Sequence, residues 1–142
     1  MSVDSSASAT WLGDLVHGQG TVRPASGAFP ELSLTMARRF ENRDTGTSPE
    51  ELIAAAHSSC FSMALAHGLA TGGHTAERID TTARVTVGLP EGISAIHLTV
   101  KGKVPGIDAA AFSAAVEDAK ANCPVSKALA AVPITAEATL EL

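Results

Sequence analysis

A stretch of 19 residues from Leu52 to Ala70 carries no formal charge, and helix-boundary signals stand at both of its ends. Ahead of it, the run Ser-Pro-Glu-Glu at 48–51 provides an N-cap serine, a proline at the first helical position and a glutamate three residues after the cap. Behind it, Gly72 and Gly73 are residues with which helices commonly end. We therefore expect one long helix that begins after Ser48 and ends near Gly72.

The length of this segment also fits a membrane span, so its composition has to decide between the two structures. Ten of its 19 residues are alanine, serine or glycine and two are histidine, which makes its hydrophobicity modest. We expect a buried central helix in a protein without a membrane segment.

Alternating apolar and polar residues predict strands before this helix. Residues 10–41 are expected to form strands and turns, and the last strand carries Leu32, Leu34 and Met36 on one face, alternating with Ser33, Thr35 and Ala37. A loop over 41–47 then leads to the helix.

After the helix, Asp108 is a suitable helix cap and Pro124 disfavours continuation of the helix before it. The order of elements predicts an α+β fold with mainly antiparallel strands. The expected elements are strands over 78–89 and 94–104, a helix from Asp108 to about Asn122, a short helix over 124–130 and a strand over 134–142.

The composition narrows the class of protein further. A chain of 142 residues fits one domain, and we expect a flexible lead over 1–9 and a single domain over 10–142. Apolar residues make up 45% of the chain but aromatic residues only 4%, so part of the burial is expected to come from a partner chain. The net charge of −5 argues against nucleic-acid binding. Two cysteines without a secretion signal indicate a reducing compartment, the cytoplasm.

Four features could carry chemistry: Cys60, Cys123, the pair Arg38 and Arg39, and Glu50. Each also has a structural explanation. A free cysteine is commonly an inert buried residue, arginines at a strand end are commonly solvated, and the helix dipole explains a glutamate in a first turn. Cys123 differs because it precedes a proline at the start of a short helix, where free N–H groups stabilise a thiolate.

Taken together, the four features match the needs of a thiol peroxidase. Such an enzyme requires a thiolate, a cation that holds the thiolate and the peroxide oxygens, and a second thiol that resolves the sulfenic acid. An arginine supplies a permanent charge in a planar fork, and a carboxylate can hold that fork in place.

The chain resembles the OsmC/Ohr family of hydroperoxide-reducing proteins, and the OsmC branch most closely, from Trp11 to the last strand. The two cysteine motifs are the most specific part of this resemblance. The motifs are SPEELIAAAHSSCFSMAL around Cys60 and NCPVSKAL around Cys123, with shorter matches at RFE (Arg39–Glu41), W-x-GD (Trp11–Asp14), G-x-GTV (Gly18–Val22) and VPGID (Val104–Asp108).

The resemblance implies an OsmC/Ohr-like α+β fold, with antiparallel sheets around long central helices in an intertwined homodimer. It implies that Cys60 reacts with the peroxide and that Cys123 resolves the resulting sulfenic acid as a disulfide. It also implies that Arg39, and not Arg38, and Glu50 complete the catalytic site.

The implied activity is the reduction of organic hydroperoxides to alcohols in oxidative and osmotic stress defence. The resemblance implies no cofactor and no metal, and re-reduction by an external thiol protein. In part of the family that reductant is a dihydrolipoyl group. The alanine-rich surroundings of the thiol favour organic peroxides over hydrogen peroxide, because the organic group has to be desolvated.

The spacing of Glu50 and Cys60 supports a shared site between two chains. Ten residues of helix span about 15 Å, which one arginine does not bridge comfortably. Two such helices packed antiparallel across a two-fold axis bring Glu50 of one chain near Cys60 of the other. We expect Arg39 and Glu50 to serve the partner chain's Cys60.

Two other functions fit parts of the sequence. His57, Cys60 and His67 can share a helix face and could bind zinc, although no established zinc spacing is present. Alternatively, the protein is a non-catalytic dimeric binding module for a small apolar ligand, because fold alone does not specify function.

Overall fold

The computed structural model describes residues 1–41 and 45–142. The chain forms two compact units, Met1–Leu52 and Ile53–Leu142. The loop expected over 41–47 includes residues 42–44, which lie outside the described residues. The sequence-based division at residue 10 stays a prediction, although the first strand already begins at Ala7.

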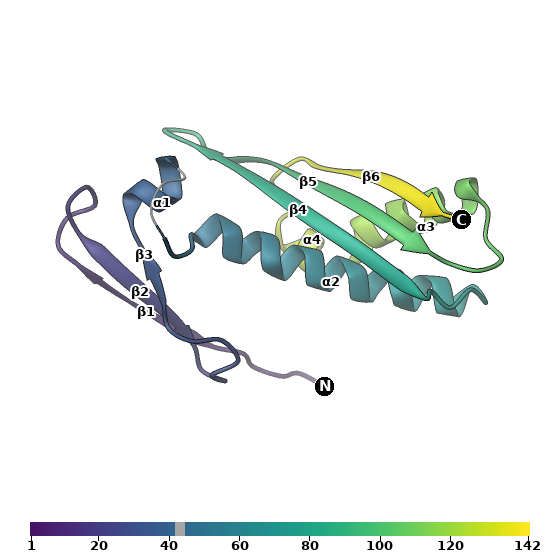
Figure 1. Cartoon of the computed structure of the whole chain (residues 1–142), viewed down its shortest axis with the longest axis horizontal. Coiled ribbons are helices and arrows are strands. Elements are labelled where there is room, and N and C mark those ends of the chain that lie inside the picture. The colour runs from purple at the N-terminus through teal and green to yellow at the C-terminus, as the bar shows by residue number, and fades with distance from the viewer. Residues whose placement is uncertain (42–44) are drawn as a thin grey trace. The chain divides into compact units, whose positions relative to one another are not determined.

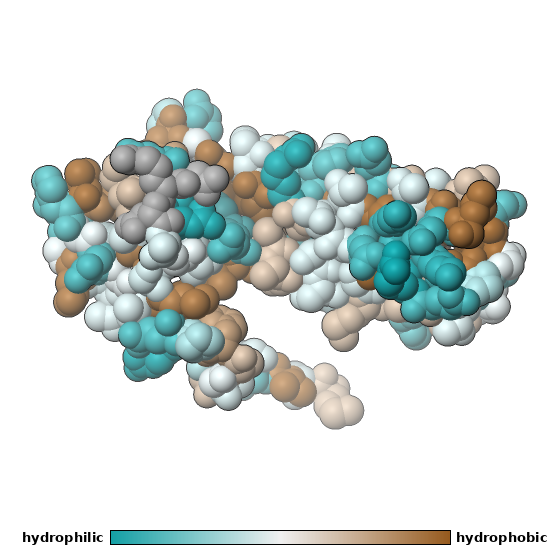
Figure 2. All heavy atoms as spheres, in the orientation of Figure 1, coloured by the Kyte–Doolittle hydropathy of each residue, from teal (hydrophilic) through white to brown (hydrophobic). Residues whose placement is uncertain are grey.

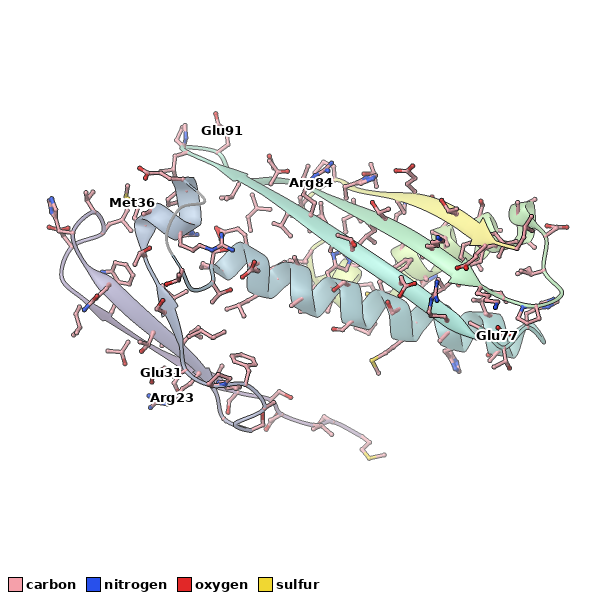
Figure 3. All side chains as sticks on the ribbon, viewed as in Figure 1. Arg23, Glu31, Met36, Glu77, Arg84 and Glu91 are labelled. Carbon is pink, nitrogen blue, oxygen red and sulfur yellow. The ribbon has the colours of Figure 1, made fainter. Side chains whose placement is uncertain are left out.

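The first unit contains an antiparallel sheet in the order β1 (Ala7–Leu12), β2 (Gln19–Pro24) and β3 (Leu32–Leu34) (Figure 1). Trp11 of β1 pairs with Gly20 of β2. A Cβ atom at position 20 would lie 2.5 Å from the Trp11 ring, so the glycine allows the indole to cover the neighbouring strand. Where β2 ends and β3 begins, Arg23 and Glu31 pair at 3.4 Å (Figure 3).

The prediction of a strand that continues to residue 37 was wrong for its second half. β3 ends at Leu34, and Met36–Glu41 form the helix α1. Thr35 is the physical reason, because its side-chain oxygen accepts a hydrogen bond from the backbone N–H of Arg38 at 3.1 Å, as an N-cap residue does. Arg38 and Arg39 therefore lie on a helix and not at a strand end.

The long helix, α2, spans Pro49–Thr71, which confirms the expected boundaries. At its start, the backbone N–H of Glu51 donates to Ser48 Oγ at 3.1 Å. At its end, Gly73 has φ +89°, and the backbone N–H of His74 donates to the carbonyl of Leu69 at 2.8 Å. This is the Schellman arrangement, in which a glycine takes the left-handed conformation.

The second unit contains a sheet in the order β4 (Arg78–Gly88), β5 (Gly92–Lys103) and β6 (Ile134–Glu141). The β4–β5 pair is an antiparallel hairpin, as expected. The last strand pairs with β5 in parallel, with Leu98 opposite Ala136. A parallel pair requires a crossover connection, which the helices α3 (Ala109–Asn122) and α4 (Pro124–Ala128) provide.

Helices α2 and α3 share one core with this sheet. The core joins apolar side chains of three elements: Phe61, Leu65 and Leu69 of α2, Leu98 and Val100 of β5, and Phe112, Val116 and Ala119 of α3. Gly102 of β5 allows close packing, because a Cβ atom there would lie 2.5 Å from the Phe112 ring.

The opposite face of the sheet is polar. Arg78, Asp80 and Arg84 alternate along β4 with half-buried residues and are exposed. Arg84 is labelled on β4 in Figure 3, and hydrophilic side chains cover much of the same region in Figure 2.

By length and composition, α2 could cross a membrane. Its three large core residues, Phe61, Leu65 and Leu69, are instead buried against the sheet and α3. The helix is thus a core helix on this side. Its other side is exposed, and Met63 at its centre is 73% exposed.

Candidate active site

The two cysteines lie together although they are separated by 63 positions. Cys60 lies in the middle of α2, and Cys123 lies between α3 and α4. Their Sγ atoms are 3.2 Å apart, and both thiols are free. A disulfide requires about 2.0 Å between these atoms, so a closure of roughly 1.2 Å would join them.

The two thiols differ in accessibility. Cys123 is fully buried, whereas Cys60 is partly exposed. A dissolved peroxide therefore reaches Cys60 more readily than Cys123. The order of reaction that the family resemblance implies, Cys60 before Cys123, stays a prediction.

The start of α4 provides hydrogen-bond donors to both sulfur atoms. Cys123 caps this helix, and its Sγ accepts a hydrogen bond from the backbone N–H of Ser126 at 3.4 Å. The backbone N–H of Val125 contacts the sulfur of Cys60. This local geometry follows from Pro124, which ends α3 and starts α4 one residue later.

These contacts move the two pKa values in opposite directions. Burial raises the pKa of the Cys60 thiol, and the neighbouring Cys123 raises it further, against the effect of the Val125 N–H. Burial also acts to raise the pKa of Cys123, but hydrogen bonds from the backbone and side chain of Ser126 and from Cys60 hold it below its ordinary value.

The thiol pair consequently carries at most one negative charge, because two thiolates at 3.2 Å would repel each other strongly. In the single chain the charge is drawn toward Cys123. None of the groups that shift the pKa of Cys60 is a cation. An additional positive charge beside Cys60 would draw the shared charge toward that sulfur.

Arg39 and Glu50 form the second pair expected from the sequence, in the first compact unit. Arg39 Nε donates to Glu50 Oε1 at 2.7 Å and to Oε2 at 3.3 Å. The Glu50 side chain is 6% exposed, and that of Arg39 is 37% exposed. The buried carboxylate therefore holds one edge of the guanidinium while the remainder reaches solvent.

The neighbouring arginine has a different role. Arg38 Nη2 donates to Glu51 Oε2 at 2.8 Å, and Arg38 Nε donates to the carbonyl of Gly46 at 3.2 Å. Thr47 Oγ1 donates to the other oxygen of Glu51 at 2.7 Å. Arg38 thus ties α1 to the start of α2, and the choice of Arg39 as the site residue stays a prediction.

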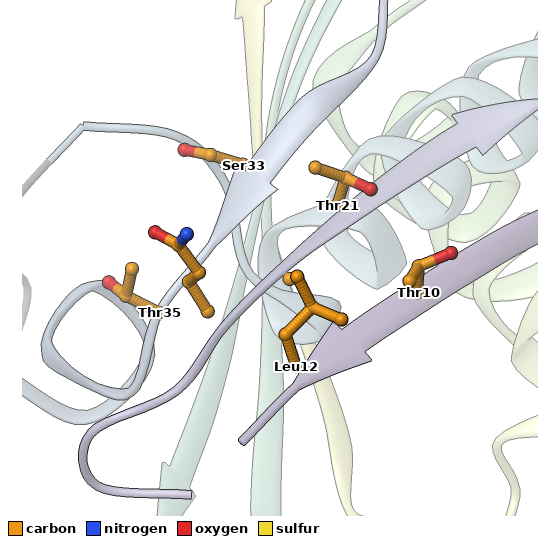
Figure 4. A pocket seen from close by; sticks show the side chains of 7 residues that line it. Thr10, Leu12, Thr21, Ser33 and Thr35 are labelled. Atoms are coloured by element: carbon orange, nitrogen blue, oxygen red, sulfur yellow. The ribbon is translucent and has the colours of Figure 1, made fainter. Parts of the chain in front are cut away.

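A cavity of about 130 Å³ adjoins Arg39, and its other lining is largely apolar. Trp11, Leu34, Met36 and Pro49 contribute apolar surface there. A wider hollow of about 350 Å³ lies on the β1–β3 sheet (Figure 4). Its lining contains neither a thiol nor a charged side chain: Thr10, Leu12, Gln19, Gly20, Thr21, Ser33 and Thr35.

Sequence reasoning missed a buried hydrogen bond beside the thiols. His57 of α2 is fully buried, and its Nε2 lies 2.7 Å from Ser126 Oγ. Burial lowers the pKa of His57 below its ordinary value. The 69 positions between these residues carry no sequence signal, although a histidine one turn before Cys60 was available as a hint.

The zinc site considered from the sequence has no support in the arrangement of its ligands. His67 is exposed, whereas His57 is buried and paired with Ser126. Among residues 1–41 and 45–142, no group of three histidine, cysteine, aspartate or glutamate side chains is placed to hold a metal ion.

The structure thus assembles the four expected residues as two pairs, one in each compact unit. A partly exposed thiol 3.2 Å from a buried free thiol can be oxidised to a disulfide with it, which is the chemistry of a thiol-based redox protein. Comparison with known proteins gives the particular family. A family model described as OsmC-like protein matches residues 42–137. Peroxiredoxin OsmC of Escherichia coli K12 is 43% identical over 134 residues, which cover 92% of this chain and 93% of that protein.

Solved structures show the same fold. An organic hydroperoxide resistance protein OsmC from Legionella pneumophila has a TM-score of 0.68 at 23% identity and covers 96% of this chain and 97% of its own. OhrB of Bacillus subtilis has a TM-score of 0.67 at 24% identity, and the match covers 96% of this chain and 98% of OhrB. The chain therefore belongs to the OsmC family, and its relationship to the named peroxiredoxin places it among the cysteine-based peroxidases.

Proposed function

We propose that this protein reduces organic hydroperoxides to alcohols through Cys60 and Cys123. The observation that carries the proposal is the 3.2 Å separation between an accessible and a buried free thiol. The hydroperoxide resistance named for structural relatives points to the same substrate class.

In the first step, the Cys60 thiolate attacks the terminal oxygen of the hydroperoxide. The O–O bond breaks, an S–O bond forms, and the alkoxide leaves and takes a proton from solvent. Cys60 becomes a sulfenic acid. The apolar cavity beside Arg39 supports an organic substrate, because it offers surface for the desolvated organic group.

In the second step, the Cys123 sulfur attacks the Cys60 sulfenic sulfur. An S–S bond forms, the S–O bond breaks, and the departing hydroxide leaves as water after protonation. An external dithiol then reduces the disulfide and becomes oxidised itself. We propose that this dithiol is a protein-bound dihydrolipoyl group. We also propose that the protein acts in the cytoplasm.

Arg39, held in place by the Glu50 carboxylate, supplies the cation that the first step requires. Within the described part of the chain, the guanidinium of Arg39 hydrogen-bonds through Nε to Glu50, which leaves the Nη edge for a thiolate or a peroxide oxygen. We propose that the protein is a homodimer in which this pair serves the partner chain's Cys60. The exposed outer side of α2, with Met63 at its centre, supports burial by a second copy.

The cysteine variants test this division of labour. Cys60→Ser is expected to abolish peroxide consumption. Cys123→Ser is expected to permit one turnover per chain and then to stop at the sulfenic acid, detected by mass spectrometry after trapping with dimedone. Full steady-state turnover by Cys123→Ser would contradict the resolving role.

A further inference from the structure

The hydrogen bond between His57 and Ser126 stands beside the thiol pair and has no part in the steps described so far. Both residues are buried, with 0% and 4% of their surfaces exposed. His57 comes from α2, three positions before Cys60, and Ser126 comes from α4, three positions after Cys123. The bond therefore connects the two elements that carry the thiols.

The protonation of His57 follows from its surroundings. Its Nδ1 is buried without a hydrogen-bond partner among the described residues. A buried orphan N–H is rarer in proteins than an under-satisfied acceptor. The proton of the neutral ring therefore belongs on Nε2, which donates to Ser126 Oγ at 2.7 Å.

Ser126 is consequently fixed as a donor toward Cys123. Its oxygen accepts from His57, so its own hydroxyl proton is available to another acceptor. Its backbone N–H donates to Cys123 Sγ at 3.4 Å, and its side chain also interacts with that sulfur.

We propose that His57 and Ser126 are positioning residues for the resolving step. His57 orients Ser126, and Ser126 holds the Cys123 sulfur as a thiolate facing Cys60. The proposal rests on the proposed function for its reaction: the Cys123 thiolate attacks the Cys60 sulfenic sulfur, Cys123 is oxidised, Cys60 is reduced, and hydroxide departs and is protonated by solvent.

Other charged groups near Cys123 do not offer the same contact. On α2, Cys60 lies 3.2 Å from Cys123, and His57 contacts Ser126. On β5, His97 lies on the opposite face of the sheet from Leu98 and contacts Thr135 Oγ1 at 2.6 Å. The charged residues of α3 and α4 are exposed or paired with one another: Glu117, Asp118, Lys120 and Lys127.

The proposal predicts opposite effects on the two steps. Without the contact from Ser126, the Cys123 thiolate is less stable, so disulfide formation slows. In the reduced protein, however, the shared negative charge then shifts toward Cys60, so sulfenic acid formation does not slow. General damage to the fold would slow both steps.

The test follows both steps in Ser126→Ala and His57→Leu during a single turnover with cumene hydroperoxide. Each variant is expected to form the disulfide about tenfold more slowly, the scale of one hydrogen bond to a charged group. His57→Gln keeps an N–H donor and is expected to recover much of the rate. Ser62→Ala is the matched control, because Ser62 also lies on α2 but its hydroxyl bonds to the Ser58 carbonyl at 2.8 Å and to Thr81 Oγ1 at 2.7 Å.

A second measurement does not depend on peroxidase activity. In a Cys60→Ser background, the thiolate absorbance of Cys123 is followed against pH. Ser126→Ala and His57→Leu are expected to move the midpoint upward and Ser62→Ala to leave it in place. A common midpoint in all of these proteins would overturn the inference, as would equal slowing of both steps. A wild-type protein that consumes no peroxide would refute the proposed function alone, since the titration still reports on Ser126.

Discussion

At the scale of single residues, the environments of Cys60 and Cys123 suit them to different steps. An accessible sulfur can meet the substrate, and a buried sulfur held by N–H donors can wait as a thiolate without being oxidised itself. Burial and the neighbouring Cys123 raise the pKa of Cys60, and a cation beside this sulfur would favour its thiolate. We propose Arg39, which Glu50 orients, for this role.

Burial lowers the pKa of His57, and this shift is expected to contribute to the pH dependence of the stability of the fold. Its pKa in the folded chain lies below the ordinary value of 6.5, so the unfolded chain binds a proton first as pH falls. The free energy of unfolding is expected to decrease below about pH 6.5, by at most about 1.4 kcal/mol per pH unit for this one proton. Urea denaturation of the wild type and His57→Gln at several pH values measures the difference. A difference that is constant across pH 5 to 7 (roughly the range in which histidine titrates) would contradict this assignment.

At the scale of elements, local capping signals made most helix boundaries predictable. Ser48, Gly73 and Asp108 act through hydrogen bonds or conformations that involve only neighbouring residues. Asp108 Oδ1, for example, accepts from the N–H of Ala111 at 2.8 Å. The prediction that the strand continues beyond Leu34 was wrong. The alternation of Leu32, Leu34 and Met36 favoured a strand, whereas Thr35 caps a helix there. The bond from His57 to Ser126 could not be predicted, since it depends on the packing of α2 against α4.

Helix α2 carries the argument for sites shared between two chains. Glu50 and Cys60 are ten residues apart on this helix, about 15 Å along its axis. Arg39→Ala and Cys60→Ser are each expected to be inactive. Refolding the two variants together, so that mixed dimers form, is therefore expected to restore activity. A shared arrangement gives each mixed dimer one intact site, so random pairing recovers about a quarter of the wild-type rate.

The controls for this mixing experiment are each variant refolded with itself. These proteins are expected to stay inactive. If the mixed sample also stays inactive while mixed dimers are demonstrably present, then Arg39 and Cys60 act within one chain and the shared site is wrong.

At the scale of the whole molecule, the family and the fold class could be predicted from the sequence, because the two cysteine motifs are specific and the shorter matches extend the resemblance along the chain, and the family comparison confirms both. The parallel pairing of β6 could not, since alternation gives no strand direction. The 3.2 Å distance between the sulfur atoms of Cys60 and Cys123 could not be predicted either. It depends on the core that α2, α3 and the sheet share.

The central claim is that Cys60 is a reagent and that Cys123 is its resolving partner. The most direct measurement is single-turnover peroxide consumption by pre-reduced protein, followed by a count of free thiols, with cumene hydroperoxide and hydrogen peroxide compared at equal concentration. We expect both thiols of each chain to disappear and the organic peroxide to react faster. Survival of both thiols without consumption of either peroxide would contradict the account and would favour a binding module built on the same fold.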